Sequence, residues 1–194
     1  LSYLKFKKIP VISDSLPFYA LAQNKSLTKR VLNALDIANT KFYTINKNDS
    51  LKKIQELKFP LIVKPNNLGS SIGVKTVYDY NTLLNALDFA FIYDNEVLIE
   101  ECIENLKEVN IAVMGNYDHQ KVSEIEEVFS GNKFLTYVDK YIGGGKGKLK
   151  GGVKVPTKGT SKGMASANRK LPADLDKKLR DEIEEIAAKA FKLL

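Results

Sequence analysis

The segment FPLIVKPNNLGSSIGVKTV, residues 59–77, constrains the fold of this chain more than any other stretch. Two short runs rich in β-branched residues flank a loop of asparagine, glycine and serine, which is the pattern of two strands joined by a turn. Lys64 stands inside the first run, where a buried strand would continue with apolar residues. The segment therefore predicts two strands, an open glycine- and serine-rich loop and a charged group within the first strand.

The rest of the chain mixes helical and strand patterns. Helices are predicted near residues 18–22, over 26–37, after a cap at Asp49 and Ser50, after Asp79, and from Pro172 to the end of the chain. Strands are predicted over residues 4–12, 41–45, 61–65, 73–77, 96–103, 108–116, 121–129 and 133–141. Because several of these strands follow one another as hairpins, the pattern predicts an α+β fold rather than a parallel doubly wound sheet.

The positive charge of the chain is concentrated in one glycine-rich stretch. The formal net charge is +7, and residues 140–170 carry nine Lys or Arg residues, no acid and eight of the twelve glycines. The remainder sums to 7 − 9 = −2, which argues against the spread basic surface of a nucleic-acid-binding protein. The composition of residues 142–170 predicts a mobile loop, and two interpretations stay open: a lid over an active site and a linker.

Composition also restricts the compartment and the kind of site. No run approaches the roughly 20 apolar residues that a membrane span needs, and the first residues show no secretory signal pattern. The single cysteine, Cys102, excludes an internal disulfide and favours a reducing compartment, so we expect a cytoplasmic protein without a membrane partner. With His119 as the single histidine, a His/Cys metal cage is implausible.

The loop after Lys64 has the composition of a phosphate-binding turn. Gly69, Ser70 and Ser71 offer backbone N–H groups and hydroxyls to phosphate oxygens, and Lys64 would add a cation beside them. The motif is not a P-loop, because the GxxxxGK[ST] pattern is absent and no helix is predicted directly after it. A polar hairpin turn with a lysine that extends to solvent is the alternative interpretation.

Other charged residues favour a nucleotide site over that alternative. Lys25 immediately precedes a predicted helix. Glu100 and Glu101 end the apolar run VLIEE, and Glu108 follows seven residues later. Carboxylates at the end of a strand can accept hydrogen bonds from a ribose or from an amino group. Lysines, an open loop and these acceptors together predict a nucleotide-binding site.

The segments NKSLTKRVLNALDI, VKPNNLGSSIGV, DNEVLIEECI and EVNIAVMGN together resemble the D-alanine–D-alanine ligases of the ATP-grasp superfamily, and the resemblance covers most of the chain. It implies two α+β subdomains with a nucleotide cleft between them, incomplete at both ends. The implied parts are the end of an N-terminal substrate domain at 1–24, a central subdomain at 25–115, and the start of a C-terminal subdomain at 116–194, which includes the mobile loop.

The resemblance also implies roles for the candidate residues. Lys25 and Lys64 would hold the ATP phosphates. The loop that closes over phosphate and substrate would contain Gly69, Ser70 and Ser71. The residues implied to contact adenine are Glu100, Glu101 and Ile103, the last two through their backbone, and Glu108 would bind the ribose. Residues implied at the reacting groups are Ser70, Lys140 and Tyr141. Many relatives carry lysine where this chain has Glu101, which weakens a side-chain role there but not a backbone role.

The implied reaction is the ATP-dependent joining of two D-alanines through an acylphosphate, for peptidoglycan precursor synthesis. ATP and D-alanine are the implied partners, the ligands for Mg²⁺ are expected beyond residue 194, and the full-length protein is expected to be a homodimer. We expect this chain to be an excerpt of a longer protein and to be inactive by itself. No metal ligand is expected within it, and the carboxylates Glu124, Glu126 and Glu127 are interpreted as a solvated strand face.

Two alternatives to this function stay open. One keeps the ATP-grasp fold but joins another acid and amine, giving a different dipeptide or a depsipeptide. Tyr141 favours the dipeptide, because relatives that join D-lactate often change that position. The other alternative is a non-catalytic nucleotide-binding module.

Overall fold

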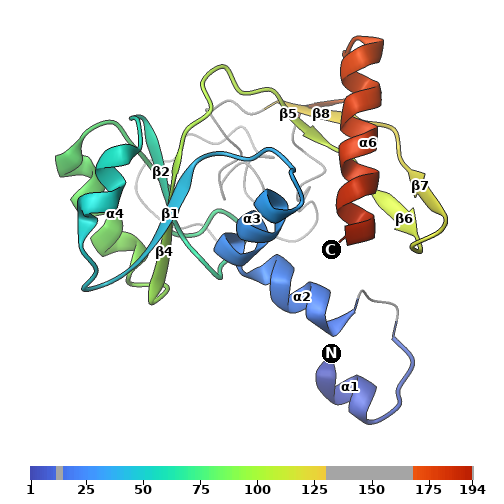
Figure 1. The fold of residues 1–194 in the computed structure, drawn as a ribbon, viewed down its shortest axis with the longest axis horizontal. Coiled ribbons are helices and arrows are strands. Elements are labelled where there is room, and N and C mark those ends of the chain that lie inside the picture. Colours follow the sequence, from blue (N-terminus) through green and yellow to red (C-terminus); the bar gives the residue numbers. More distant parts are fainter. Residues whose placement is uncertain (12–14, 130–167, 194) are drawn as a thin grey trace, which may run out of the picture. The chain divides into compact units, whose positions relative to one another are not determined.

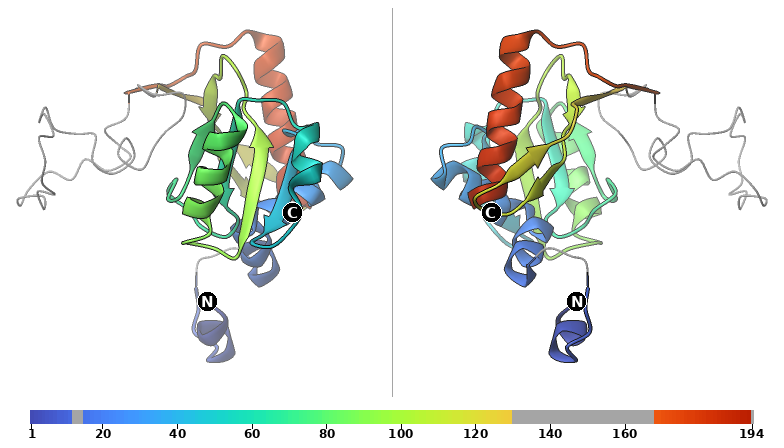
Figure 2. Two further views of the ribbon diagram at one scale, coloured as in Figure 1. Left: turned by 90° about the vertical axis from the view of Figure 1, so that its left-hand side faces the viewer. Right: turned by 90° about the vertical axis from the view of Figure 1, so that its right-hand side faces the viewer.

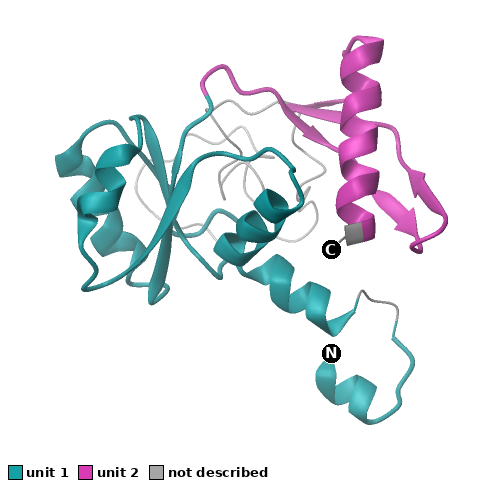
Figure 3. Ribbon diagram, in the orientation of Figure 1, with its two compact units in different colours: residues 1–103, 193–194 teal, residues 104–192 magenta. Residues whose placement is uncertain are grey.

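The computed structural model describes residues 1–11, 15–129 and 168–193. The chain divides into two compact units, one made of residues 1–103 with the last residues of the chain, and the other made of residues 104–192 (Figure 3). The expected subdomain boundary between residues 115 and 116 stays a prediction.

The first unit is built on a four-stranded antiparallel sheet with the strand order β1-β4-β2-β3. Its strands are β1 (Phe42–Asn46), β2 (Leu61–Pro65), β3 (Lys75–Val77) and β4 (Glu96–Glu101). Its helices are α1 (Ser2–Phe6), α2 (Leu16–Gln23), α3 (Lys25–Ala34), the 3₁₀ helix η1 (Leu51–Glu56) and α4 (Tyr80–Ala90). Figure 1 shows α4 and α3 on opposite sides of this sheet.

One face of the sheet forms the hydrophobic core with α4. Successive side chains of a strand point to opposite faces, so Leu61 and Val63 of β2 share a face with Val97 and Ile99 of β4. All four are fully buried, and they pack against the apolar stripe of α4, which consists of Leu83, Ala86, Leu87 and Ala90. The left-hand view in Figure 2 shows α4 lying in front of the strands. Burial of these side chains fixes which face of each strand looks away from the core.

The opposite face of the same strands is polar. Lys64 pairs in register with Leu98, and Ile62 pairs with Glu100, so these four side chains share the face that looks away from α4. Strand alternation therefore places Lys64, which interrupts the apolar run of β2, on the face opposite the core.

Helix α4 begins where the sequence predicts. Asp79 accepts a hydrogen bond from the backbone N–H of Thr82, and the Thr82 side chain reaches back to the N–H of Asp79, which is a capping box. Leu83 and Leu87 lie one turn apart on the buried side of the helix. The capping residue and the helical spacing of the buried apolar residues both match the prediction, so the predicted helix is confirmed.

The second unit contains two small antiparallel sheets and one long helix. Strands β5 (Glu108–Asn110), β8 (Glu126–Phe129) and β9 (Asn168–Lys170) form one sheet, and β6 (Val113–Gly115) pairs with β7 (Gln120–Val122). Helix α6 (Lys177–Leu193) follows β9 in the chain. Asp176 accepts a hydrogen bond of 2.9 Å from the N–H of Leu179, so it acts as the N-terminal cap.

Several predicted elements differ from the structure. The strand predicted over 4–12 is wrong, because residues 2–6 close helical bonds such as Lys5 N–H to Leu1 O. The helix predicted after Ser50 is a 3₁₀ helix. The helix predicted from Pro172 begins at Lys177, because the N–H of Ala173 first bonds to Ile125 O. The strand predicted over 133–141 lies outside the described residues.

The single strand predicted over 108–116 is two strands. Residues of β5 pair with β8, whereas residues of β6 pair with β7, and the chain passes from one sheet to the other between them. Ala112 at this crossing exchanges hydrogen bonds with Ser123, both of 2.9 Å. The strand predicted over 121–129 is divided for the same reason. The α+β class itself is confirmed.

Across the described ranges, no helix has both the length and the apolar character needed to cross a membrane.

Candidate functional site

A polar pocket in the first unit lies between α3 and the polar face of the sheet. Its volume is about 440 Å³, within the roughly 300–1,000 Å³ typical of small-molecule sites. The charged side chains that line it are three lysines and one glutamate, so these groups sum to 3 − 1 = +2. They are Lys25 and Lys29 of α3, Lys64 of β2 and Glu100 of β4. Ala22, Leu98 and Ile103 supply apolar lining.

Glu100 lies at the centre of the charges. One carboxylate oxygen, Oε1, pairs with the ammonium of Lys64. The other, Oε2, lies 2.9 Å from Lys29 Nζ and accepts a hydrogen bond of 2.8 Å from the hydroxyl of Thr40. Both oxygens of this buried carboxylate are therefore satisfied by donors from different elements.

Burial alone would raise the pKa of Glu100, but Lys64, and then Lys29, hold that pKa below its ordinary value. The carboxylate is therefore ionised at neutral pH. Lys64 is available as a mobile cation only if something else replaces it at Oε1.

Lys25 holds the start of the loop between β2 and β3, residues 66–74, here called the serine loop. Its Nζ donates to the carbonyl oxygens of Pro65, at 3.0 Å, and Asn66, at 3.2 Å, and also to that of Leu68. Burial lowers the pKa of Lys25 to about 8, helped by the charge of Lys64 and opposed by Asp94 and Glu100. An anion that entered the pocket would favour the charged form of this lysine.

Asn66 connects α3 with the end of β2. It is fully buried, and its side-chain oxygen accepts a hydrogen bond of 2.8 Å from the N–H of Ser26 in the first turn of α3. Its amide group donates to the carboxylate of Glu96 on β4. Asn66 also accepts from the N–H of Lys25 through its carbonyl. These bonds fix the N-terminus of α3 beside the loop that follows Asn66.

The serine loop has a backbone suited to presenting its N–H groups. Ser70 and Ser71 both have φ near +57°, at 56° and 58°, a left-handed conformation that is uncommon outside glycine. A side chain built on Gly69 would meet only open space, whereas Gly73, with φ of 74°, packs against the ring of Pro65. Gly73 is therefore required by close packing, and Gly69 leaves the loop surface uncovered.

The remaining predicted site residues occupy different environments. The N–H of Glu101 bonds to Lys41 O at 3.0 Å, and its carboxylate accepts from the N–H of Lys58 at 3.0 Å. Ile103 lines the pocket with an exposed side chain, and no described residue bonds to its backbone N–H. Glu108 lies in β5 of the second unit.

Lys140 and Tyr141 lie outside the described residues, as do residues 142–167 of the predicted loop, and residues 168–170 form β9.

Four polar residues of the pocket were not predicted from the sequence: Thr28, Lys29, Asn39 and Thr40. Lys29 stands four residues after Lys25, so helical spacing would have placed both lysines on one face of α3. Thr40 and Asn39 lie in the connection to β1, where no pattern marks them. The side-chain oxygen of Asn39 is buried and accepts no hydrogen bond from the described part of the chain, so it could accept one from a ligand.

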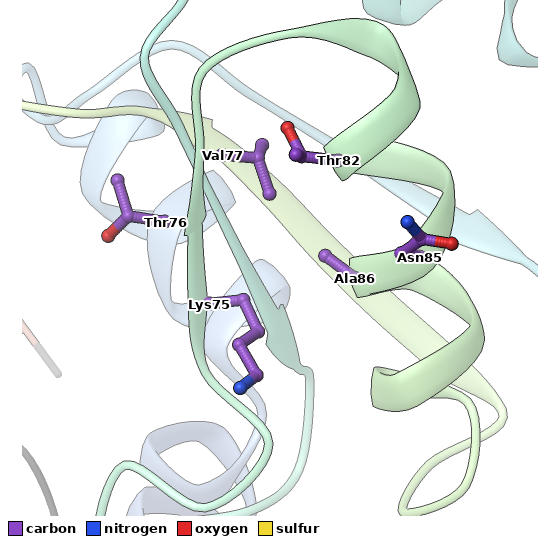
Figure 4. Close-up of a pocket in the computed structure, with 6 residues that line it drawn as sticks. All are labelled: Lys75, Thr76, Val77, Thr82, Asn85 and Ala86. Carbon is purple, nitrogen blue, oxygen red and sulfur yellow. The ribbon is translucent and has the colours of Figure 1, made fainter.

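A second, smaller hollow lies between β3 and α4 and has a volume of about 200 Å³. Figure 4 shows Val77, Thr82 and Ala86 on the helix side of β3, with Thr76 pointing to the other side of the strand. Lys75 is its one charged lining residue, and its ammonium lies 4.9 Å from the ring centre of Phe89. This hollow has no carboxylate or cation cluster, and we take the pocket of Glu100 as the candidate site.

The three carboxylates Glu124, Glu126 and Glu127 each form an ion pair. Glu127 is 7% exposed, and its Oε1 lies 3.4 Å from Lys107 Nζ. The other two pairs are Glu126 with Arg169, at 2.6 Å, and Glu124 with Arg180, at 3.0 Å. The expectation of a solvated face is therefore wrong for Glu127, which is buried and paired with Lys107.

No group of three or more His, Cys, Asp or Glu side chains able to hold a metal ion occurs in residues 1–11, 15–129 and 168–193.

Chemically, the pocket is suited to an anionic ligand that also carries a hydrogen-bond donor. Lysines attract phosphate or carboxylate groups, and a fixed, ionised carboxylate accepts from an amino group or a hydroxyl. The uncovered serine loop begins beside Lys25, which bonds to the carbonyl of Leu68 directly before Gly69.

Comparison with known proteins identifies relatives of this chain. The family described as "D-ala D-ala ligase C-terminus" matches residues 31–169. A D-alanine–D-alanine ligase of Thermosipho africanus is 35% identical over 98% of this chain and 48% of its own length. The chain thus spans about half the length of the curated relatives that it matches.

Solved structures are similar as well. The D-alanine–D-alanine ligase of Helicobacter pylori is 28% identical, with a TM-score of 0.68 over 98% of this chain and 49% of that one. The VanG D-Ala:D-Ser ligase of Enterococcus faecalis is 25% identical, with a TM-score of 0.75 over 99% of this chain and 50% of that one.

Proposed function

This chain belongs to the D-alanine–D-alanine ligase family, which has the ATP-grasp fold, and we propose that its protein is an ATP-dependent ligase that joins two D-alanines. The observation that carries this proposal is the pocket between α3 and the sheet, where three lysines surround one ionised carboxylate. Such a pocket suits a ligand with a polyphosphate at one end and a base with an amino group at the other.

The phosphates of ATP would bind at Lys64 and Lys25. Lys64 would exchange its ion pair with Glu100 for a phosphate oxygen, and Lys25 would exchange loop carbonyls for another. Charge-assisted bonds between ionised partners are roughly twice as strong as bonds between neutral groups, which favours the exchange of neutral carbonyls for phosphate at Lys25, whereas Lys64 exchanges one anionic partner for another. The N–H groups and hydroxyls of Gly69, Ser70 and Ser71 would complete the phosphate site.

Adenine would bind at the end of β4. Glu100 would accept a hydrogen bond from the amino group of the base, and the N–H of Ile103 would donate to a ring nitrogen. Because the N–H of Glu101 already bonds within the sheet, the proposed backbone contact of Glu101 falls to its carbonyl oxygen. Glu108 is proposed to bind the ribose.

In the proposed reaction the carboxylate of the first D-alanine attacks the terminal phosphorus of ATP, which gives an acylphosphate and ADP. The amine of the second D-alanine then attacks the acyl carbon, releasing phosphate and forming the peptide bond. Ser70, Lys140 and Tyr141 are the residues proposed at the reacting groups. Because the described residues offer no metal cluster, Mg²⁺ stays a prediction and no step is assigned to it. A homodimer, a cytoplasmic location and a role in peptidoglycan precursor synthesis also stay predictions.

A second candidate is a ligase that accepts another amine or hydroxyl as its second substrate. The similarity to a D-Ala:D-Ser ligase favours keeping this candidate.

The test is an assay of the full-length protein with ATP and D-alanine. We expect release of ADP and phosphate in equal amounts, with D-alanyl-D-alanine detected by mass spectrometry. Assays with D-serine or D-lactate as the second substrate separate the two candidates by which product forms fastest. Tight ATP binding without any D-amino-acid-dependent phosphate release would instead support a nucleotide-binding module and reject the ligase.

A further inference from the structure

Lys29 contacts the pocket carboxylate directly, although it belongs to neither of the predicted phosphate contacts. Its ammonium lies 2.9 Å from Glu100 Oε2 and donates to the hydroxyl of Thr40 at 2.8 Å. That hydroxyl in turn donates to the same Oε2 at 2.8 Å. Lys29, Thr40 and Glu100 therefore form a closed triangle of hydrogen bonds around one oxygen atom.

The ion pair within this triangle is more buried than Lys64, whose side chain is 21% exposed. The side chains of Lys29 and Glu100 are 14% and 10% exposed. Lys29 Nζ also lies 5.2 Å from the ring centre of Phe42, which stands opposite Glu100 in the sheet. A buried ion pair is weak evidence for a role in stability, because desolvation offsets most of the attraction. A role in the site is therefore worth separate consideration.

The two oxygens of Glu100 have different partners. Oε2 is held by Lys29 and Thr40, neither of which is proposed to contact ligand. Oε1 is held by Lys64, which is proposed to move to phosphate when nucleotide binds. Oε1 then becomes the acceptor that faces the ligand, while Oε2 keeps its donors.

Resting on the proposed function, we propose that Lys29, together with Thr40, is a positioning residue that keeps Glu100 a fixed acceptor for the amino group of the nucleobase and thereby sets the preference for adenine over guanine. Adenine carries an amino group where guanine carries a carbonyl oxygen. An ionised carboxylate only accepts hydrogen bonds, so it bonds to the amino group of adenine and repels the carbonyl oxygen of guanine.

The charges around Glu100 explain why Lys29 is needed. Lys25 and Lys29 face it from α3 and Lys64 from β2, while β1 places the uncharged Phe42 opposite it. Burial favours the protonated form of Glu100, and the adjacent lysines oppose that effect. With Lys64 drawn to phosphate, Lys29 is the adjacent cation that remains. Without it, the carboxyl would take up a proton and could donate to guanine.

The experiment compares ATP and GTP binding to the full-length protein by calorimetric titration, at about pH 6 and about pH 8, because a carboxyl whose pKa the substitution has raised is more protonated at the lower pH. The variants are Lys29→Met, which keeps an unbranched side chain one atom shorter and without the charge, and Thr40→Val, which removes the bridging hydroxyl. Arg30→Ala is the matched control, because it removes a positive charge from the exposed neighbouring position on α3.

Wild type and Arg30→Ala should prefer ATP equally at both pH values. Lys29→Met should lose at least ~10-fold of the ATP-to-GTP preference, and more at the lower pH, since a bond to a charged group contributes roughly that factor. Thr40→Val should change the preference in the same direction. An unchanged ratio in a folded Lys29→Met protein would overturn the inference.

Two further readouts separate this inference from its premise. Wild-type protein that binds no ATP would overturn the proposed function, and the inference with it. If Lys29→Met does not fold, an unchanged ratio in Thr40→Val overturns the positioning role. NMR titration of Glu100 without nucleotide should show a raised carboxyl pKa in Lys29→Met, and an unaltered pKa there would contradict the role of Lys29 independently of ATP.

Discussion

ATP binding should draw protons from solution at alkaline pH, and Lys25 should be the group that takes them up. Burial, with the charge of Lys64, lowers the pKa of Lys25 to about 8 from its ordinary 10.5. About half of the free protein therefore lacks this proton at pH 8, and about nine tenths lacks it at pH 9. A bound polyphosphate favours the ammonium form, because an adjacent opposite charge raises the pKa of a lysine.

The expected magnitude is about 0.5 proton taken up per ATP at pH 8 and about 0.9 at pH 9. The phosphates of the nucleotide contribute little in this range, since their last protons leave at a pKa of about 6. Calorimetric titration in two buffers of different ionisation enthalpy measures the uptake as the slope of the observed enthalpy. The full-length protein is used without D-alanine, so that no turnover occurs.

Lys25→Met should abolish the uptake, whereas Lys47→Met should leave it unchanged, because Lys47 is exposed and lies after β1, away from the pocket lining. The same shift has a consequence for folding. The unfolded chain binds more protons than the folded one between pH 8 and 10.5, so Lys25 makes stability rise with pH across that window. The assignment to Lys25 would be refuted if the wild type showed no proton uptake at pH 9, or if Lys25→Met showed the same uptake as the wild type.

Three further predictions concern the pocket and its frame. Lys64→Met should weaken ATP binding by about 1.5–3 kcal/mol, the range for a charge-assisted bond, and equal affinity by calorimetry would reject the phosphate contact. Asn66→Ala should lower the free energy of unfolding in urea by about 1–3 kcal/mol, because it leaves buried partners unpaired, while exposed Asn95→Ala should change it little. Gly73→Ala should lower the free energy of unfolding by at least ~1 kcal/mol, since its Cβ would lie 2.6 Å from the Pro65 ring at φ of 74°. Gly69→Ala, whose Cβ would meet open space, should leave the melting temperature nearly unchanged.

The sequence predicted the elements in which local pattern and tertiary packing agree. Helix α4 has both a capping residue, Asp79, and an apolar stripe, and β2 and β4 are apolar runs whose core residues are fully buried. The predictions failed where a partner decided the conformation. The run 108–116 has one uniform alternation, but its two halves pair with different strands.

The candidate site was only partly predictable for a related reason. Lys64 and Glu100 each break a local apolar pattern, so a sequence shows them as unusual. Lys29 breaks no pattern, because a lysine on an amphipathic helix normally faces solvent. Its role appears only once α3 lies beside the sheet and Thr40 completes the triangle around Glu100.

The hydrophobic core on one face of the sheet also determines the chemistry on the other face. Lys64 can reach Glu100 because β2 and β4 pair with Ile62 opposite Glu100 and Lys64 opposite Leu98. A slip of one residue would turn Glu100 towards α4 and expose Val97 and its apolar neighbours, which the core does not allow. The burial of apolar residues against α4 thus fixes the register that brings the lysines and the carboxylate together, and changes in that core should alter nucleotide binding even though no core residue touches the pocket.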